Sequence, residues 1–193
     1  MTTLRNTSPQ RIAEPGVGTL ELWPVPTTEH LLCEILRDLF EYHWQDITFG
    51  PLLQGAAWEL RTDCPPHNVV LHDGYLTIDF GRMHVHLCIG AHRGDPDCPT
   101  DPTLARQRRT ARAEFFRRVN RDGTPDTWGF RMFNGQGDQQ ITILFPNPFV
   151  SEEQQFYDTP RWERLKLWDQ IRKRYLELES EIFDRSGRRM LYP

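Results

Sequence analysis

The chain has 193 residues and a formal net charge of −4, and 38% of its residues are hydrophobic, 11% aromatic and 26% charged. These proportions are ordinary for a soluble globular protein, so they exclude a largely disordered chain. The small negative charge predicts no bulk attraction to nucleic acid or anionic membranes. We expect one domain over residues 17–193 that ends in a long C-terminal helix, preceded by a flexible polar tail over residues 1–16.

Targeting features and cysteines predict a cytoplasmic protein. The first ten residues lack the apolar segment of a signal peptide. No apolar run reaches the roughly 20 residues that a membrane-spanning helix needs, so we expect no membrane partner. The four cysteines are scattered and contain no C-x-x-C pair, which argues against a disulfide scaffold. Reduced thiols in a bacterial-type cytoplasm are therefore expected.

The first half of the chain is predicted to contain one helix and several short strands. Residues 19–23 alternate between apolar and polar side chains, which indicates a strand. Thr27 or Thr28 caps a helix that runs to about Trp44, because apolar residues there recur at helical spacing. The other expected strands cover residues 56–60, 69–72, 75–80 and 83–89, with tight turns at Asp73-Gly74 and Gly81-Arg82.

The second half is predicted to contain two helices and one hairpin. Asp101 caps a helix expected over residues 102–119. Residues 128–133 and 139–145 are expected to pair as a hairpin, and a final helix is expected over residues 160–184. Hairpins with helices before, between and after them predict an α+β fold. We expect an antiparallel or mixed β-sheet with about three helices packed mainly on one face.

The strand over residues 83–89 carries the most informative pattern. Its apolar residues would face one side of the sheet, and the other side would carry three metal-capable side chains, His84, His86 and Cys88. If Gly81-Arg82 is a two-residue turn, Asp79 lies opposite His84. Directly opposed side chains are close enough to touch, so this carboxylate is expected to orient the His84 imidazole.

The same register places Thr77 opposite His86 and Tyr75 opposite Cys88.

The hairpin near residue 135 predicts a second group of polar side chains. A turn at Gly135-Gln136 would pair Phe130 with Ile141 and Trp128 with Ile143. The opposite face would then carry Arg131, Gln140 and Thr142. If both hairpins belong to one sheet, their polar sides coincide. That sheet face would present Asp79, His84, His86, Cys88, Arg131 and Gln140.

Two chemistries fit this predicted polar face, and the sequence leaves open whether the protein is an enzyme. His84, His86, Cys88 and His92 are candidate ligands for a divalent transition metal, with zinc or iron as the first choices. In a metal-dependent enzyme, Asp79, His84 and Arg131 would be the catalytic candidates.

Alternatively, Arg131 and Gln140 would bind a small anionic ligand without metal, because an arginine fork suits carboxylate and phosphate groups. In a third reading, the protein is structural or binds a partner through its arginine-rich or C-terminal helix, and the histidines and the cysteine are merely packed.

Two helices are candidate partner surfaces. The helix expected over residues 102–119 is rich in arginine, and a solvated face is favoured over binding of phosphate, nucleic acid or an acidic partner. We do not expect nucleic acid as a partner. The helix expected over residues 160–184 has an apolar stripe that packs on the domain or, alternatively, forms a homodimer.

Overall fold

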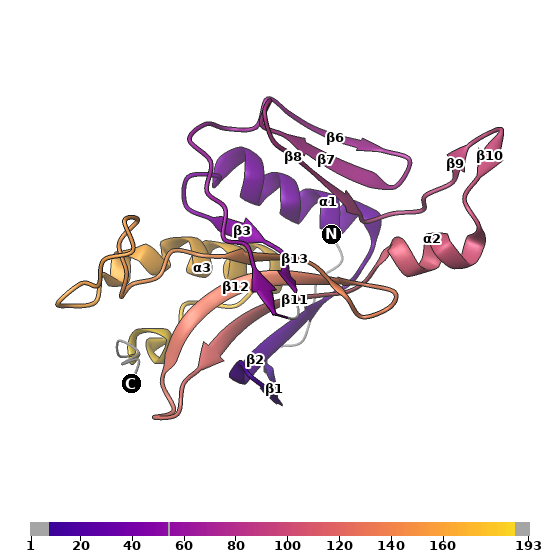
Figure 1. Cartoon of the computed structure of the whole chain (residues 1–193). Coiled ribbons are helices and arrows are strands. Elements are labelled where there is room, and N and C mark those ends of the chain that lie inside the picture. Colours follow the sequence, from indigo (N-terminus) through magenta and orange to yellow (C-terminus); the bar gives the residue numbers. More distant parts are fainter. Residues whose placement is uncertain (1–7, 54, 188–193) are drawn as a thin grey trace. The chain divides into compact units, whose positions relative to one another are not determined.

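A computed structural model describes residues 8–53 and 55–187 of the chain (Figure 1). Antiparallel hairpins and three α-helices confirm the predicted α+β class. The strands are β1 (Gln10–Glu14), β2 (Gly18–Val25), β3 (Thr48–Gly50), β4 (Leu52–Leu53), β5 (Ala56–Ala57), β6 (Asn68–His72), β7 (Tyr75–Asp79), β8 (His84–Cys88), β9 (Gly94–Asp95), β10 (Cys98–Pro99), β11 (Thr110–Val119), β12 (Pro125–Asn134) and β13 (Gln139–Leu144). The α-helices are α1 (Glu29–Arg37), α2 (Pro102–Arg108) and α3 (Lys166–Ile171). Shorter helical segments are η1 (Asp38–Tyr42), η2 (Trp162–Leu165), η3 (Arg172–Leu176) and η4 (Ile182–Arg185). Within the described ranges, no helix is both long enough and apolar enough to span a membrane.

The chain divides into two compact units. The first unit holds residues up to 23, residues 114–130 and residues from 144 onward, and the second holds residues 24–113 and 131–143. Strands β11 and β12 run through both units and belong to a six-stranded sheet with the order β1-β2-β11-β12-β13-β3. The three-stranded sheet β6-β7-β8 lies wholly in the second unit.

The hairpin β7–β8 has the register that the sequence predicts. Asp79 pairs with His84, and Tyr75 at the other end of β7 pairs with Cys88. The backbone N–H of Phe80 donates to the carbonyl of Met83 at 2.8 Å, which closes the two-residue turn. Gly81 begins this turn with φ +85, a left-handed conformation that favours glycine. Alternation of apolar side chains and a glycine at the turn therefore fix this hairpin.

One face of the three-stranded sheet is buried together with helix α1. Leu76 and Ile78 of β7 are fully buried, as are Leu32, Ile35 and Leu36 of α1. Figure 1 shows the sheet lying along α1, within the same unit. Because the apolar face is covered in this way, the opposite face carries the polar side chains of β7 and β8 outward.

The predicted helix over residues 102–119 is wrong beyond its first two turns. Asp101 does cap a helix, since its carboxylate accepts hydrogen bonds from the N–H groups of Thr103 and Leu104. Helix α2 ends at Arg108, and the next ten residues form β11. Strand β11 is buried on both faces along most of its length, so it lacks the strict alternation of a half-buried strand and resembles a helical stripe in sequence.

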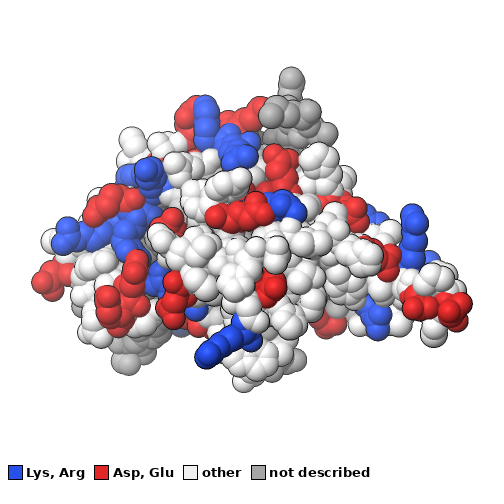
Figure 2. All heavy atoms as spheres, turned by 90° about the horizontal axis from the view of Figure 1, so that it is seen from above, with Lys and Arg blue, Asp and Glu red and all other residues white. Residues whose placement is uncertain are grey.

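The arginines of this region consequently divide between surface and interior. Arg106, Arg108, Arg109 and Arg112 are exposed, whereas Arg117 is buried. Figure 2 shows Lys and Arg side chains interspersed with Asp and Glu over the face that it presents. The single arginine-rich helix face predicted from the sequence is thus replaced by a short helix and a strand.

Three other expectations change in the structure. Gln10–Glu14, within the segment expected to be a flexible tail, forms β1 and pairs with β2. The loop between β12 and β13 is longer than predicted, because Asn134 donates to the carbonyl of Asp138 and Gly137 takes φ +87. The extra loop residues shift the register, so that the N–H of Phe145 donates to Trp128 in place of a Trp128–Ile143 pair.

The expected final helix is interrupted at Glu177. Helical structure runs from Trp162 to Leu176 as η2, α3 and η3, and Glu177 then adopts a left-handed conformation with φ 56. The N–H of Leu178 returns to the carbonyl of Arg172 at 3.2 Å. Because the chain reverses there, Asp184 on η4 reaches the interior of the first unit.

A buried network of charged side chains organises the first unit. Asp184 is fully buried and pairs with two arginines, Arg117 and Arg172, each at 3.0 Å. Glu21 on β2 accepts from the Nε of Arg117 at 2.5 Å, and Glu181 contacts both arginines. Buried charges persist only when they are paired and hydrogen-bonded, and each buried charge here has such partners.

Glu181 makes the stability of the first unit dependent on pH. Burial alone would raise its pKa, but hydrogen bonds and positive charges from Arg117 and Arg172 outweigh burial and hold the pKa below its usual value. The group therefore stabilises the fold above the pKa of the unfolded chain, and this contribution disappears as the pH falls through the folded pKa. We expect Glu181→Gln to lower the free energy of unfolding at neutral pH and to reduce its loss between about pH 5 and pH 3.

Urea denaturation at pH 7, 5 and 3 measures this effect. The matched control is Glu163→Gln, which changes an exposed carboxylate on η2. The prediction would be contradicted if the free energy of unfolding of Glu181→Gln fell as steeply with decreasing pH as that of the wild type.

Candidate functional site

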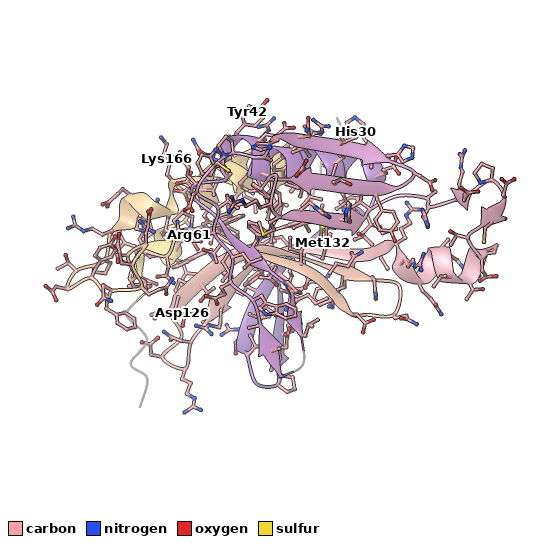
Figure 3. All side chains as sticks on the ribbon, turned by 45° about the horizontal axis from the view of Figure 1, so that its top comes forward. His30, Tyr42, Arg61, Asp126, Met132 and Lys166 are labelled. Atoms are coloured by element: carbon pink, nitrogen blue, oxygen red, sulfur yellow. The ribbon has the colours of Figure 1, made fainter. Side chains whose placement is uncertain are left out.

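His84 and His86 lie side by side on the exposed face of the three-stranded sheet. Their ring centroids are 4.8 Å apart, and Nδ1 of His86 lies 2.8 Å from the Thr77 hydroxyl. Figure 3 draws the side chains on the ribbon and labels His30, the second residue of α1. Asp79 lies opposite His84 as predicted, but its carboxylate accepts the N–H of Gly81 at 2.7 Å. The side chain of Asp79 thus stabilises the turn.

The other two predicted metal ligands lie elsewhere. Cys88 is buried, and its thiol points toward the carbonyl of Gly90 at 3.8 Å. Nδ1 of His92 contacts the Asp73 carboxylate at 2.9 Å. In residues 8–53 and 55–187, no three His, Cys, Asp or Glu side chains are placed to hold one metal ion. The predicted set of His84, His86, Cys88 and His92 is therefore not assembled as one site.

Arg131 and Gln140 belong to the six-stranded sheet, so the assumption that both hairpins share one sheet is wrong. Arg131 is only 5% exposed, and its guanidinium lies 5.1 Å from the centre of the Phe133 ring. Gln140 donates to the carbonyl of Cys88 at 3.3 Å and to that of Arg108 at 3.1 Å. Gln140 on β13 therefore links the six-stranded sheet to the backbone at the end of β8.

A second cluster of polar side chains lies at this end of β8. Gln140 joins the carbonyls of Cys88 and Arg108, and both the Cys88 thiol and the Arg108 guanidinium affect the pKa of the Tyr75 hydroxyl. Tyr75 and Cys88 are the opposed pair at the end of the β7–β8 ladder, and Arg108 comes from the last turn of α2. Thr110 at the start of β11 donates to the carbonyl of Cys88 at 3.1 Å, which fixes α2 beside β8.

Burial keeps both polar groups on the strands neutral near pH 7. It raises the pKa of the Tyr75 hydroxyl, and Arg108 offsets only part of that rise. Burial also raises the pKa of the Cys88 thiol, while Tyr75, Arg108 and Arg109 act in the opposite direction. The cluster thus combines an O–H donor and an S–H donor with the positive charge of a guanidinium.

Asp73 is the acidic group beside this cluster, and its charge is already hydrogen-bonded. Its carboxylate accepts the N–H groups of Arg93 and Gly94, each at 2.9 Å. These two hydrogen bonds lower the pKa of Asp73, and His92 adds to the effect. The carboxylate anchors the segment after β8 to the Asp73-Gly74 turn, and Arg108 is the positive group that acts on Tyr75.

Two of the three residues of this cluster could be predicted from the sequence. The hairpin register places Tyr75 opposite Cys88, and the structure confirms that pair. Sequence reasoning missed Arg108 because the arginines of residues 102–119 were assigned to one continuous helix. Because α2 ends at Arg108 and β11 begins at Thr110, the backbone of Arg108 lies where Gln140 can join it to the end of β8.

Solved structures with a similar arrangement include two of ChuX. The crystal structure of ChuX has a TM-score of 0.49 and 14% sequence identity, with 81% of this chain and 78% of that chain covered. A structure described as the heme-binding protein ChuX has a TM-score of 0.45 and 14% identity, with 78% and 74% covered. A protein from Agrobacterium tumefaciens has a TM-score of 0.47 and 12% identity, with 80% and 71% covered.

A search of curated proteins gave no match. Residues 9–177 match the family of unknown function DUF7676, and the chain therefore belongs to that family.

Proposed function

We propose that the protein is a metal-free binding module for a small anionic ligand, which it binds at Tyr75, Cys88 and Arg108. The observation that supports this proposal is that Tyr75 pairs with Cys88 while Gln140 joins the carbonyls of Cys88 and Arg108, so that the charge of Arg108 acts on two neutral donors, the Tyr75 hydroxyl and the Cys88 thiol. A guanidinium offers paired N–H donors that match the oxygens of a carboxylate or phosphate. The hydroxyl adds a directional donor next to that fork.

Electrostatics favour an anion over a neutral or cationic ligand at this site. Arg108 and Arg109 both act on the Cys88 thiol as positive charges. The opposing charge is that of Asp73, whose carboxylate already accepts two backbone N–H groups and contacts His92. An incoming carboxylate or phosphate would therefore meet a local excess of positive charge.

The thiol favours binding over covalent catalysis. Nucleophilic cysteines react as thiolates and have lowered pKa values. Burial instead raises the pKa of Cys88, so the thiol stays protonated near pH 7. Cys88 therefore serves as a neutral donor.

Thermal unfolding with phosphate and with di- and tricarboxylates tests this proposal. A ligand at about 100 times its Kd stabilises the folded state by about 2.7 kcal/mol. We expect a rise in Tm for the wild type with at least one of these compounds, and its loss in Arg108→Gln. Tyr75→Phe removes one hydrogen bond to a charged ligand and is expected to weaken binding by about tenfold or more.

The control variant is Arg106→Gln, which changes an exposed arginine on the same helix whose guanidinium donates to Thr103. Its Tm should rise with ligand as much as that of the wild type. An unchanged wild-type Tm with every compound, or equal rises in wild type and Arg108→Gln, would refute the proposed site.

A further inference from the structure

Strand β8 leaves one backbone edge open to another strand. It is the last strand of the sheet β6-β7-β8 and pairs with β7 on one side only. The turn bond between Phe80 and Met83 makes Ile78–Val85 and Leu76–Leu87 the hydrogen-bonded pairs of this ladder. The N–H and C=O groups of the intervening residues, His84 and His86, therefore point away from β7.

The next outward carbonyl on β8 confirms this direction. The carbonyl of Cys88 accepts hydrogen bonds from Thr110 at 3.1 Å and from Gln140 at 3.3 Å, both outside the three-stranded sheet. Those side chains close the edge at Cys88. At the opposite edge of the sheet, formed by β6, a backbone group is also already hydrogen-bonded, because the Arg37 guanidinium donates to the carbonyl of Val69. The open segment is thus the part of β8 at His84 and His86.

This segment lacks the features that usually block an edge. Lysine, proline and bulges protect edge strands from pairing with other chains. Strand β8 has the sequence His-Val-His-Leu-Cys and pairs with β7 in an unbroken register. Its outward side chains, His84 and His86, are exposed, and Val85 on the other face is half-buried.

We propose that the β8 edge binds an acidic segment of another protein in extended conformation, as an added strand. The backbone groups of His84 and His86 would supply the main-chain hydrogen bonds. Alternate side chains of the added strand would lie beside the two imidazoles, which donate to carboxylates. Positive charge stands at both ends of the open segment, from Arg82 in the turn and from Arg108 and Arg109 near Cys88.

Two carboxylates lie near the open segment, and both already accept backbone N–H groups: Asp79 accepts that of Gly81, and Asp73, near Cys88, accepts those of Arg93 and Gly94. An acidic partner is therefore complementary to the edge, and a basic one is not.

A labelled peptide in which glutamate alternates with valine is the probe for this proposal. Paired side chains of adjacent strands share a face, so its glutamates would flank the histidines and its valines would flank Val85. We expect saturable binding by fluorescence anisotropy that weakens as salt is raised. The same peptide with N-methyl groups on the residues that pair with His84 and His86 should bind at least tenfold more weakly. A lysine–valine peptide should also bind at least tenfold more weakly.

Two variants distinguish the contribution of the His86 backbone N–H to peptide binding from that of the His86 side chain. His86→Pro removes the outward N–H and leaves the inner ladder bonds, which edge strands tolerate. We expect it to lose peptide binding, whereas His86→Ala should keep most of it because its N–H remains. Both variants should keep the ligand-induced rise in Tm that depends on Arg108, so this result is separable from the anionic-ligand site.

Four outcomes would overturn the proposal. They are no binding by the wild-type protein, equal binding of the N-methylated peptide, equal binding of the lysine–valine peptide, and an unaltered affinity in folded His86→Pro. Light scattering gives a further check, because a dimer that His86→Pro disrupts would assign this edge to a second copy of the chain.

Discussion

Asp184→Ala is expected to lower the free energy of unfolding by about 3–5 kcal/mol, the usual cost of removing one partner from a buried ion pair. Asp184 is fully buried and accepts from four donors. Two are the guanidinium groups of Arg117 and Arg172, and two are the indole N–H groups of Trp128 at 2.8 Å and Trp168 at 3.0 Å. Alanine would leave these donors buried without their shared acceptor.

Urea denaturation followed by tryptophan fluorescence measures this loss, because Trp128 and Trp168 both contact Asp184 directly. The matched control is Glu179→Ala, which removes an exposed carboxylate that contacts Lys173. Exposed ion pairs contribute little to stability, so the control should unfold close to the wild type. Similar urea midpoints for Asp184→Ala and Glu179→Ala would show that the network does not stabilise the fold.

The hairpin β7–β8 shows what the sequence could predict. Its apolar and polar side chains alternate without a break, and Gly81 suits the left-handed conformation at the start of a two-residue turn. Any slip by one residue would place Ile78 or Leu76 in solvent, so a single register is compatible with the pattern. Local chemistry alone therefore determined the Tyr75–Cys88 pair.

Strand β11 shows where such reasoning fails. Phe115 and Phe116 are both buried although they are neighbours, and Arg117 is buried as well. A strand that is covered on both faces has no polar side, so its sequence carries no period of two. The charge of Arg117 is tolerated only because Glu21 and Asp184, remote in the sequence, supply its partners. A local sequence pattern cannot predict such a network of ion pairs between remote residues.

The candidate site combines both cases. Its tyrosine and cysteine come from a hairpin that the sequence predicts, whereas its guanidinium depends on where α2 stops. Arg131 looked like the better anion ligand because strand alternation placed it with the polar residues. The structure buries that side chain against Phe133 instead, since both faces of β12 are covered. Burial on both faces therefore misled the prediction of the site as well as the prediction of the fold.

Gly74→Ala is expected to destabilise the second unit strongly. Gly74 has φ +79, and a Cβ there would lie 2.6 Å from the backbone carbon of Ala91. Its carbonyl also accepts the N–H groups of Ile89 and Gly90, each at 2.9 Å. The left-handed conformation costs about 1–2 kcal/mol for a residue with a Cβ. Overpacking adds about 1–3 kcal/mol, so the total expected loss of stability is about 2–5 kcal/mol.

Gly123→Ala separates the two causes of this loss. Gly123 has φ +83, close to that of Gly74, but a Cβ there would meet nothing within 4 Å. This control should therefore lose only the conformational part, about 1–2 kcal/mol. The hydrogen bonds from the N–H groups of Ile89 and Gly90 to the Gly74 carbonyl hold the backbone of Ala91 close to Gly74. In Gly74→Ala, the backbone strain should therefore be transmitted to the adjacent Tyr75. Urea denaturation gives both stabilities, and equal losses in the two variants would show that close packing against Ala91 contributes nothing.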